Sequence, residues 1–199
     1  MPRDEKALHH EKSDESKVAL LLIDVINPLE FEGAENLLKR ALPVAQTIAG
    51  LKSRAKRAGV PVVYVNDNFG RWQSDFTRVV EYCLNDTPGK KMVELLRPEE
   101  DDYFVLKPKH SGFFLTSLYT LLRDLGVETL ILCGVATDIC VLFTANDAYM
   151  QDFKLIVPPD GVASEREDYG DEALRIMERV LKADLRPAAE IDFGALVEA

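Results

Sequence analysis

Apolar runs of strand length alternate along this chain with longer segments whose apolar residues recur at helical spacing. This alternation constrains the fold most, because strands separated by helices pair in parallel and need helices on both faces of their sheet. We therefore predict a three-layer αβα domain with a mostly parallel, six-stranded sheet. Strands are expected at 18–23, 60–65, 103–106, 129–133, 152–157 and near 189–191, and helices at 34–57, 76–84, 116–125 and 172–181.

The chain is long enough for one domain with a substantial core. Its 199 residues are 47% hydrophobic, whereas residues 1–16 mix both charge signs and hold few apolar side chains. A segment of that composition cannot bury enough apolar surface to fold. We interpret residues 1–16 as a charged N-terminal arm and residues 17–199 as a single domain.

Charge and cysteine spacing narrow the expected partners and location. A formal net charge of -10 opposes binding to a phosphate backbone or to an anionic membrane surface. The N-terminal residues lack the apolar core of a signal peptide, and no apolar run approaches the ~20 residues that span a bilayer. The three cysteines lie far apart, without disulfide or metal-type spacing. We expect a cytoplasmic protein with a small-molecule partner and no nucleic-acid or membrane partner.

A glycine-led turn, GVATDIC, joins an apolar strand to a helix and ends at Cys140. Either Thr137 or Asp138 is a plausible N-cap, which places Cys140 in the first helical turn, where free N–H groups and the helix dipole favour a thiolate. We therefore expect Cys140 to be acidic and nucleophilic. Cys83 and Cys133 are interpreted as buried structural cysteines.

Charged side chains stand at the ends of two other predicted strands. Asp24 follows the first strand, and Lys107 ends the third, with Lys109 and His110 close behind, so any of these last three could supply a positive charge. The carboxyl ends of parallel strands share one edge of the sheet, so we expect these groups to converge with Cys140. A carboxylate can accept the proton of a thiol, and a nearby cation favours the thiolate.

The loop after the second predicted strand offers further candidates. Asn66, Asn68 and Trp72 belong to this loop, and we name them with Phe113 as candidate substrate-binding residues. For the aromatic side chains of the loop, packing against their own domain is an equally open interpretation.

Most of the domain resembles the isochorismatase-like cysteine hydrolases, a family that includes nicotinamidases and N-carbamoyl amidohydrolases. The resemblance implies that Asp24 is the general acid and base, that Lys107 rather than Lys109 is the cation, and that Cys140 is the nucleophile. It also implies a cis peptide bond before Ala136, whose N–H would join that of Cys140 as an oxyanion hole. The matching segments are 21–24 (LLID), 107–114 (KPKHSGFF), 134–141 (GVATDICV), 144–148 (TANDA) and Asp160.

The same resemblance implies a Rossmann-like strand order, 3-2-1-4-5-6, and a homodimer or homotetramer. Two departures from the family pattern stand out. Ile26 occupies a position where many members have Gln, and the sequence Asn66-Asp67-Asn68 stands where nicotinamidases have an Asp-x-His metal pair. We therefore expect no catalytic metal and no other cofactor.

The expected function is that of a cysteine-dependent amidohydrolase. Family members that cleave the enol ether of isochorismate generally lack the cysteine, so Cys140 favours hydrolysis of a C–N bond in a small amide or carbamoyl compound through a thioester. Two alternatives stay open: an isochorismatase-like ether hydrolase, and a catalytically silent binding or assembly module on the same fold.

Overall fold

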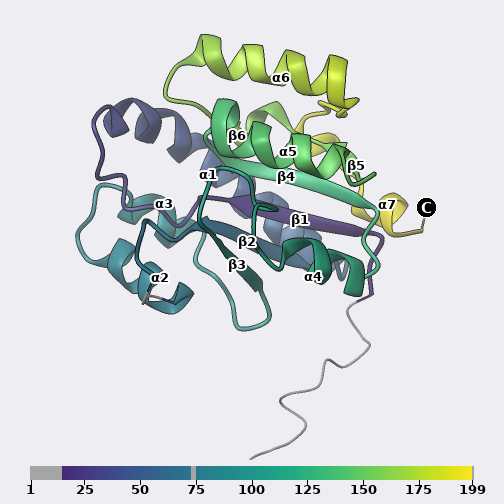
Figure 1. Cartoon of the computed structure of the whole chain (residues 1–199), viewed down its shortest axis with the longest axis horizontal. Coiled ribbons are helices and arrows are strands. Elements are labelled where there is room, and N and C mark those ends of the chain that lie inside the picture. The colour runs from purple at the N-terminus through teal and green to yellow at the C-terminus, as the bar shows by residue number, and fades with distance from the viewer. Residues whose placement is uncertain (1–14, 73–74, 199) are drawn as a thin grey trace, which may run out of the picture.

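The computed structural model describes residues 15–72 and 75–198. Within these residues the strands form one sheet, in which β1 pairs with β2 and β4, β2 with β3, and β4 with β5 and β6, all in parallel (Figure 1). The strand order β3-β2-β1-β4-β5 matches the first five places of the predicted order 3-2-1-4-5-6, but the sixth strand, β6, pairs with β4 rather than with β5. The sheet is six-stranded, and its strands are β1 (Val18–Ile23), β2 (Val62–Asp67), β3 (Tyr103–Lys107), β4 (Thr129–Val135), β5 (Lys154–Ile156) and β6 (Val162–Ala163).

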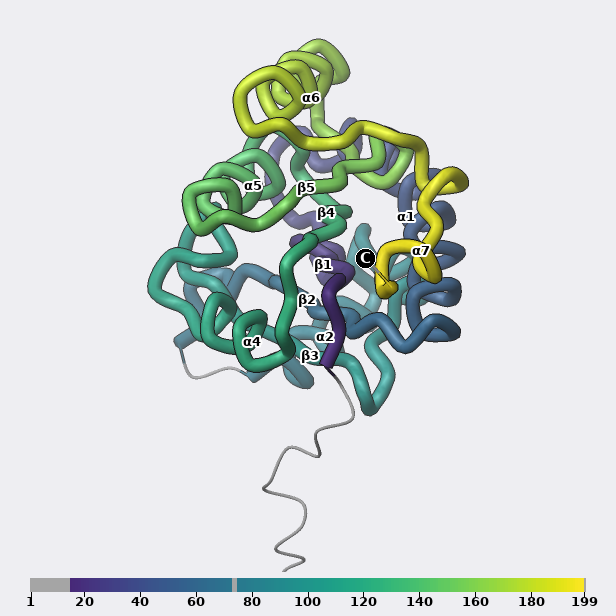
Figure 2. The backbone as a smooth tube through the Cα atoms, turned by 90° about the vertical axis from the view of Figure 1, so that its right-hand side faces the viewer, coloured from purple at the N-terminus to yellow at the C-terminus, as the bar shows by residue number. Residues whose placement is uncertain are grey.

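Helices cover both faces of this sheet, which confirms the three-layer prediction. Figure 2 shows α1 and α7 on one side of the strands and α4 and α5 on the other. Among the described residues, no helix combines the length and apolar character needed to span a membrane. The helices are α1 (Ala34–Arg57), α2 (Phe76–Leu84), α3 (Lys90–Leu95), α4 (Leu118–Asp124), α5 (Leu142–Tyr149), α6 (Glu167–Leu181) and α7 (Phe193–Glu198).

The central strand β1 is buried on both faces of the sheet, which is why its sequence is an unbroken apolar run. All its residues are buried, and successive side chains point to opposite faces. Leu20 and Leu22 pack in the core beneath α1, whereas Leu21 and Ile23 pack in the core beneath α4 and α5. A strand that contributes to two cores has no polar face, which is the pattern the sequence shows.

The predicted sixth strand near 189–191 is wrong. Residues Ala188–Glu190 form a short 3-10 turn after Pro187, and the sixth strand is instead β6, which pairs with the end of β4. A two-residue strand offers no periodicity, so no sequence pattern could have revealed it. At the outer edge of β5, the described residues add an isolated parallel bridge between Ile156 and Asp184.

Ser16, which we assigned to the N-terminal arm, already packs against the domain. Its side chain is buried, and its backbone N–H donates to the carbonyl oxygen of Leu125 over 2.9 Å. Residues 1–14 of that arm lie outside the described residues.

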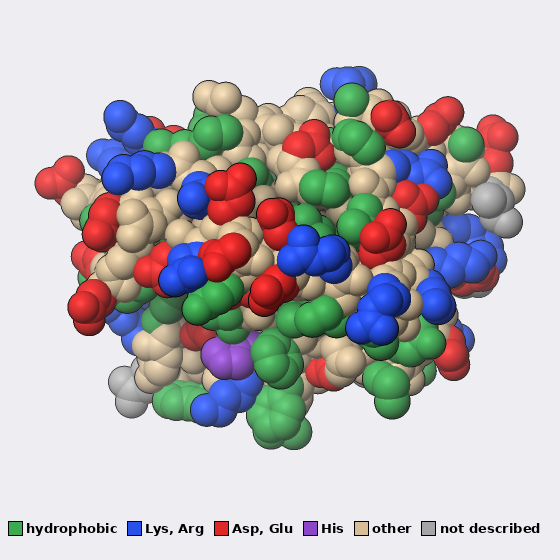
Figure 3. Space-filling model, turned by 90° about the horizontal axis from the view of Figure 1, so that it is seen from above, with side chains coloured by type: hydrophobic (Ala, Val, Ile, Leu, Met, Phe, Trp, Pro, Cys, Tyr) green, Lys and Arg blue, Asp and Glu red, His purple; other side chains and the backbone are tan. Residues whose placement is uncertain are grey.

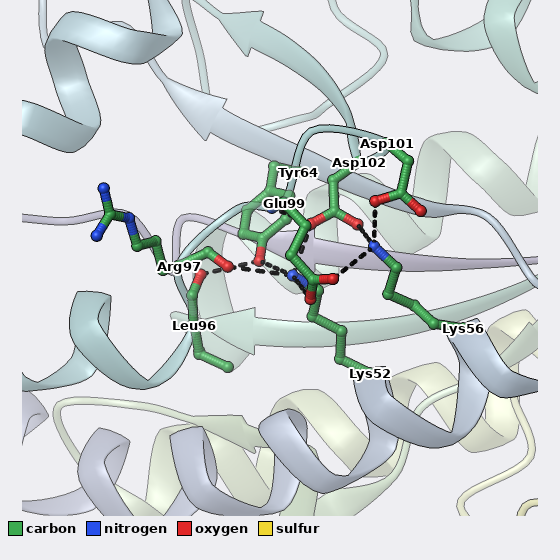
Figure 4. Close-up of polar contacts among 8 residues, drawn as sticks. All are labelled: Lys52, Lys56, Tyr64, Leu96, Arg97, Glu99, Asp101 and Asp102. Carbon is green, nitrogen blue, oxygen red and sulfur yellow. Dashed lines mark hydrogen bonds and ion pairs between the residues drawn. The ribbon is translucent and has the colours of Figure 1, made fainter.

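A buried ion cluster ties α1 to the segment that leads into β3 (Figure 4). Lys52 Nζ donates to Asp102 Oδ2 over 2.6 Å and to the Tyr64 hydroxyl over 3.1 Å, and Lys56 Nζ contacts Asp102 Oδ1 at 3.1 Å. The Tyr64 hydroxyl in turn donates to the carbonyl oxygen of Leu96. Because Asp102 directly precedes β3, this cluster anchors the strand that carries Lys107 at its other end.

Gly134 allows β4 to approach β1 at the edge where the site forms. Its φ angle is +126°, and a Cβ atom placed there would lie 2.0 Å from the carbonyl oxygen of Ile23. Ile23 is its register partner in β1 and directly precedes Asp24. A side chain at position 134 would therefore force apart the two strands that deliver Asp24 and the Cys140 turn.

Replacing Gly134 by Ala should destabilise the fold by about 3 kcal/mol, because strain at positive φ and a backbone clash add together. Denaturant unfolding of the purified protein measures this change. Gly50→Ala is the matched control: Gly50 is exposed within α1 and a Cβ there meets nothing within 4 Å, so this change should stabilise by about 0.5–1 kcal/mol. Equal effects of the two substitutions would contradict this account.

Candidate active site

Three separate elements bring Asp24, Lys107 and Cys140 together at the carboxyl edge of the sheet. Asp24 follows β1, Lys107 is the last residue of β3, and Cys140 lies in the helical turn after β4. Lys107 Nζ lies 2.8 Å from Asp24 Oδ2 and donates to Cys140 Sγ over 3.5 Å. The structure therefore brings together the three side chains that the sequence predicted to converge.

Lys107 occupies the centre of this cluster. Its side chain is fully buried, and its ammonium also donates to the carbonyl oxygen of Lys109 over 3.2 Å. Lys109 contacts the ammonium through this backbone atom, and its own side chain is exposed. His110 is also exposed, and its ring packs beside Phe143. Of the three candidate cations, Lys107 is the one that contacts both Asp24 and Cys140.

The Asp24 carboxylate is oriented by a backbone contact as well as by the lysine. Its Oδ1 atom accepts the N–H of Asp67 over 2.6 Å, while Oδ2 faces Lys107. Asp24 has a φ angle of 51°, which turns the chain away from β1 immediately after the last buried residue of that strand. Burial raises the pKa of the Asp24 carboxyl, and the opposing charge of Lys107 does not cancel this effect.

Cys140 lies in a π-helical turn, Thr137–Val141, that continues into α5. The predicted N-cap at Thr137 or Asp138 is wrong: Ala136 is the cap residue, and it makes no side-chain cap. The Asp138 carboxylate instead accepts the hydroxyl of Ser164 over 2.6 Å. The peptide bond between Val135 and Ala136 is cis, as the family resemblance implied.

The expectation of an acidic Cys140 thiol is also wrong, because its surroundings raise the pKa of this thiol. Burial raises the pKa of this thiol, and the charge of Asp24 raises it further, which together outweigh the opposing pull of Lys107. Burial acts to lower the pKa of Lys107, yet the charge of Asp24 and its ion pair with the lysine keep this pKa above its usual value. Burial and the Asp24 charge therefore oppose ionisation of the Cys140 thiol.

Cys83 and Cys133 match the structural role that the sequence indicated. Both thiols are free and buried, whereas Cys140 is partly exposed. Burial raises the pKa of Cys83 to about 12 and also raises that of Cys133. Unlike Cys140, these two thiols are not exposed to solvent and do not lie beside an ion pair such as that of Lys107 and Asp24.

The four candidate substrate-binding residues lie in different surroundings. The Asn66 amide is buried and forms hydrogen bonds to both the N–H and the carbonyl oxygen of Ile26, and Asn68 Oδ1 accepts the N–H of Gly70. Phe113 packs in the core beside Phe153, whereas Trp72 is 78% exposed. Asn66 and Asn68 thus shape the loops around the site through backbone contacts.

Asp67 is a site residue that our sequence analysis did not select. Its Oδ2 atom lies 3.7 Å from Lys107 Nζ, and its side chain is partly exposed at the edge of the site. It ends β2, which pairs with both β1 and β3, so its position at a strand end was a signal that could have identified it.

The residues present do not fit a nicotinamidase-type metal site. Asp67 contacts Lys107 and accepts the N–H of Phe69, and the Asn66 amide is engaged by Ile26. Across the part of the chain that the structure describes, no group of three or more His, Cys, Asp and Glu side chains could hold a metal ion.

Comparison with known proteins identifies the family. The Isochorismatase domain model matches residues 18–185, which span the whole sheet and the three site residues. The chain belongs to the isochorismatase family. Membership confirms the resemblance seen in the sequence and supports a hydrolase.

Relatives and solved structures agree with this assignment. The isochorismatase family protein YaaI of Bacillus subtilis is 40% identical over 173 residues, covering 87% of this chain and 95% of YaaI. Maleamate amidohydrolase of Pseudomonas putida is 29% identical, with 76% and 75% covered. The crystal structure of N-carbamoylsarcosine amidase from Thermoplasma acidophilum is 30% identical with a TM-score of 0.66, covering 88% of this chain and 99% of that one. The family thus includes amidohydrolases.

Asp24→Asn should make the Cys140 thiol more acidic, because the substitution removes the negative charge and the hydrogen-bond acceptor that raise its pKa. At pH 7, iodoacetamide should then alkylate Cys140 roughly tenfold faster or more than in the unmodified protein, since one pKa unit corresponds to a tenfold change in thiolate. Peptide mass spectrometry measures the rate, with the buried thiols of Cys83 and Cys133 as internal references. An unchanged or slower rate in Asp24→Asn would contradict the assigned direction.

Proposed function

We propose that this protein is a cysteine-dependent amidohydrolase that cleaves a C–N bond of a small amide or carbamoyl compound. The observation that carries the proposal is the buried Lys107 ammonium, which contacts Asp24 and Cys140 at once. A thiol, a carboxylate that can take its proton, and a fixed cation that stabilises the thiolate are the groups that acyl transfer through sulfur requires.

The first half of the reaction forms a thioester. The Cys140 thiol transfers its proton to Asp24 while sulfur attacks the carbonyl carbon, and the N–H groups of Ala136 and Cys140 serve as donors to the resulting oxyanion. Collapse of the tetrahedral intermediate breaks the C–N bond, and Asp24 returns the proton to the leaving nitrogen. Ammonia or an amine departs, and the acyl group remains on sulfur.

The second half restores the enzyme. Asp24, now ionised again, accepts a proton from water as the water oxygen attacks the thioester carbon. The C–S bond breaks, the acid product leaves, and the proton on Asp24 returns to the Cys140 sulfur. The raised pKa of Asp24 suits this exchange, because a carboxylate in a buried site is a stronger base than one in water.

Amide or carbamoyl substrates are supported by the relatives and by the surface charge. Maleamate amidohydrolase and N-carbamoylsarcosine amidase are named for an amide and a carbamoyl compound. On the face of this protein seen in Figure 3, Lys and Arg side chains lie interspersed with Asp and Glu. This face does not gather the positive charge that phosphate backbones require, which favours a small-molecule partner.

We place the enzyme in the cytoplasm, where reducing conditions would keep Cys140 a free thiol.

Ammonia release from a panel of small amides, ureido acids and carbamates tests the proposal. Cys140→Ala should lower the rate with any accepted substrate by about three orders of magnitude or more, and Lys107→Met by about two to three. Lys109→Met is the matched control and should stay within about twofold of the unmodified rate, because only its backbone carbonyl contacts Lys107. Ammonia release that persists in Cys140→Ala would refute the cysteine mechanism, and ether cleavage without ammonia release would favour the isochorismatase alternative.

We also propose a homodimer or homotetramer, in line with the general prevalence of closed symmetric assemblies. Light scattering coupled to size-exclusion chromatography should give a mass of two or four chains at micromolar concentration. A single species at the 22.3 kDa of one chain would contradict this expectation.

A further inference from the structure

Two hydrogen bonds connect the loop after Lys107 to the helix that follows Cys140. The backbone N–H of Gly112 donates to Thr144 Oγ1 over 3.0 Å, and the Ser111 hydroxyl donates to Asp147 Oδ2 over 2.5 Å. Thr144 and Ser111 are buried. These bonds join the loop after β3, the strand that ends at Lys107, to the helix after β4, whose first turn holds Cys140. In the sheet, β3 and β4 are separated by β2 and β1.

The helix residues of this connection lie in line with the nucleophile. Thr144 is four residues after Cys140, and Asp147 is seven after it, a spacing that places all three on one side of a continuous helix. A shift or rotation of this helix relative to the loop would therefore move Cys140 together with the hydrogen-bond acceptors Thr144 and Asp147.

The loop side of the connection is also braced internally. Ser111 Oγ accepts the N–H of Phe113, and the Thr116 hydroxyl donates to the carbonyl oxygen of Gly112 over 2.5 Å. A Cβ atom at Gly112 would lie 2.6 Å from Val65 Cγ1 and 3.4 Å from Thr144 Cγ2, so the loop packs tightly between β2 and α5. The same loop contacts the catalytic cluster directly, because the carbonyl oxygen of Lys109 accepts from Lys107 Nζ.

We propose that Ser111, Thr144 and Asp147 form a loop–helix clamp that holds the Cys140 sulfur next to the Lys107 ammonium. They are positioning residues, because their hydrogen bonds join the loop to the helix and, within the described part of the chain, none of these bonds reaches the side chain of Asp24, Lys107 or Cys140. The proposal rests on the proposed function insofar as it takes Lys107 and Cys140 as partners in one reaction.

Electrostatics explains why such a clamp matters. The attraction between an ammonium and a thiolate falls with their separation and falls further when water enters between them. Asp24 holds Lys107 by an ion pair whether or not Cys140 is nearby. The lysine therefore cannot follow a displaced sulfur, and the contact of 3.5 Å depends on what holds α5 against the loop.

A purely structural role of the clamp would predict a different result from the one proposed here. Loss of a stabilising contact alone would lower the unfolding midpoint and would alter thiol reactivity equally with and without Lys107. A positioning role predicts that the effect on Cys140 passes through the lysine charge, and so disappears when that charge is removed. Double-mutant cycles separate these two cases.

The experiment measures the pH dependence of Cys140 alkylation by iodoacetamide in full-length protein, which needs no substrate. Asp147→Ala should slow alkylation at pH 8 by about tenfold. When the Cys140 sulfur moves away from the Lys107 ammonium, the pKa of the thiol rises and less thiolate is present. In the Lys107→Met background the same substitution should change the rate by less than about twofold. Asp147→Asn should retain most of the reactivity, since its amide oxygen can still accept from Ser111. Glu172→Gln, an exposed change on α6, is the matched control and should have no effect.

If Asp147→Ala does not fold, Thr144→Val against Thr144→Ser tests the second hydrogen bond with a nearly isosteric pair, and only the Val variant should slow alkylation. A folded variant with unchanged alkylation, or an equal slowing in the Lys107→Met background, would overturn the clamp. The two proposals fail separately. If alkylation slows only when Lys107 is present and no amide is hydrolysed, the clamp is supported and the amidohydrolase proposal is refuted. If an amide is hydrolysed but alkylation does not slow in this way, the amidohydrolase proposal is supported and the clamp is refuted.

Discussion

The site depends on the buried ion pair between Lys107 and Asp24, whose charged atoms lie 2.8 Å apart. An ammonium with no exposed surface is stable only where fixed partners replace its lost hydration, and removing one partner of such a pair is strongly destabilising. Those partners come from β1 and the turn after β4, while the lysine itself comes from β3. The lysine side chain therefore has to reach past β2, which lies between β3 and β1 in the sheet.

The same burial acts on the thiol of Cys140, which we propose as the nucleophile. In water-filled surroundings a lysine beside a cysteine would make the thiol acidic, but here burial and the Asp24 charge raise the pKa of Cys140 instead. Asp24 and Cys140 share one strongly coupled environment, so the loss of a proton by one favours its retention by the other. Burial and the Asp24 charge therefore act against the ionised form of the Cys140 thiol, and the charge of Lys107 acts in its favour.

Local patterns in the sequence were sufficient for the long elements. The predicted helices at 34–57 and 76–84 match α1 and α2, because each carries an apolar stripe at helical spacing. The helix predicted from Glu172 begins instead at Glu167, since its first turn is charged and makes no apolar contribution to the pattern. The sequence analysis did not predict the short elements α3 and β6. Segments this short show no recognisable periodicity, and their structure depends on tertiary contacts.

The sequence by itself determined the sheet of parallel strands and the polar groups at their carboxyl ends, because strand periodicity and chain direction are local properties. It therefore placed Asp24, Lys107 and Cys140 at one edge. The residue pattern left Lys107, Lys109 and His110 open as the cation, and only the family resemblance favoured Lys107. The tertiary structure decided that Lys107 contacts both Asp24 and Cys140, that Asp67 lies beside it, and that burial raises the pKa of the thiol. Those outcomes depend on distance, burial and charge among residues far apart in the chain, and only packing sets these quantities.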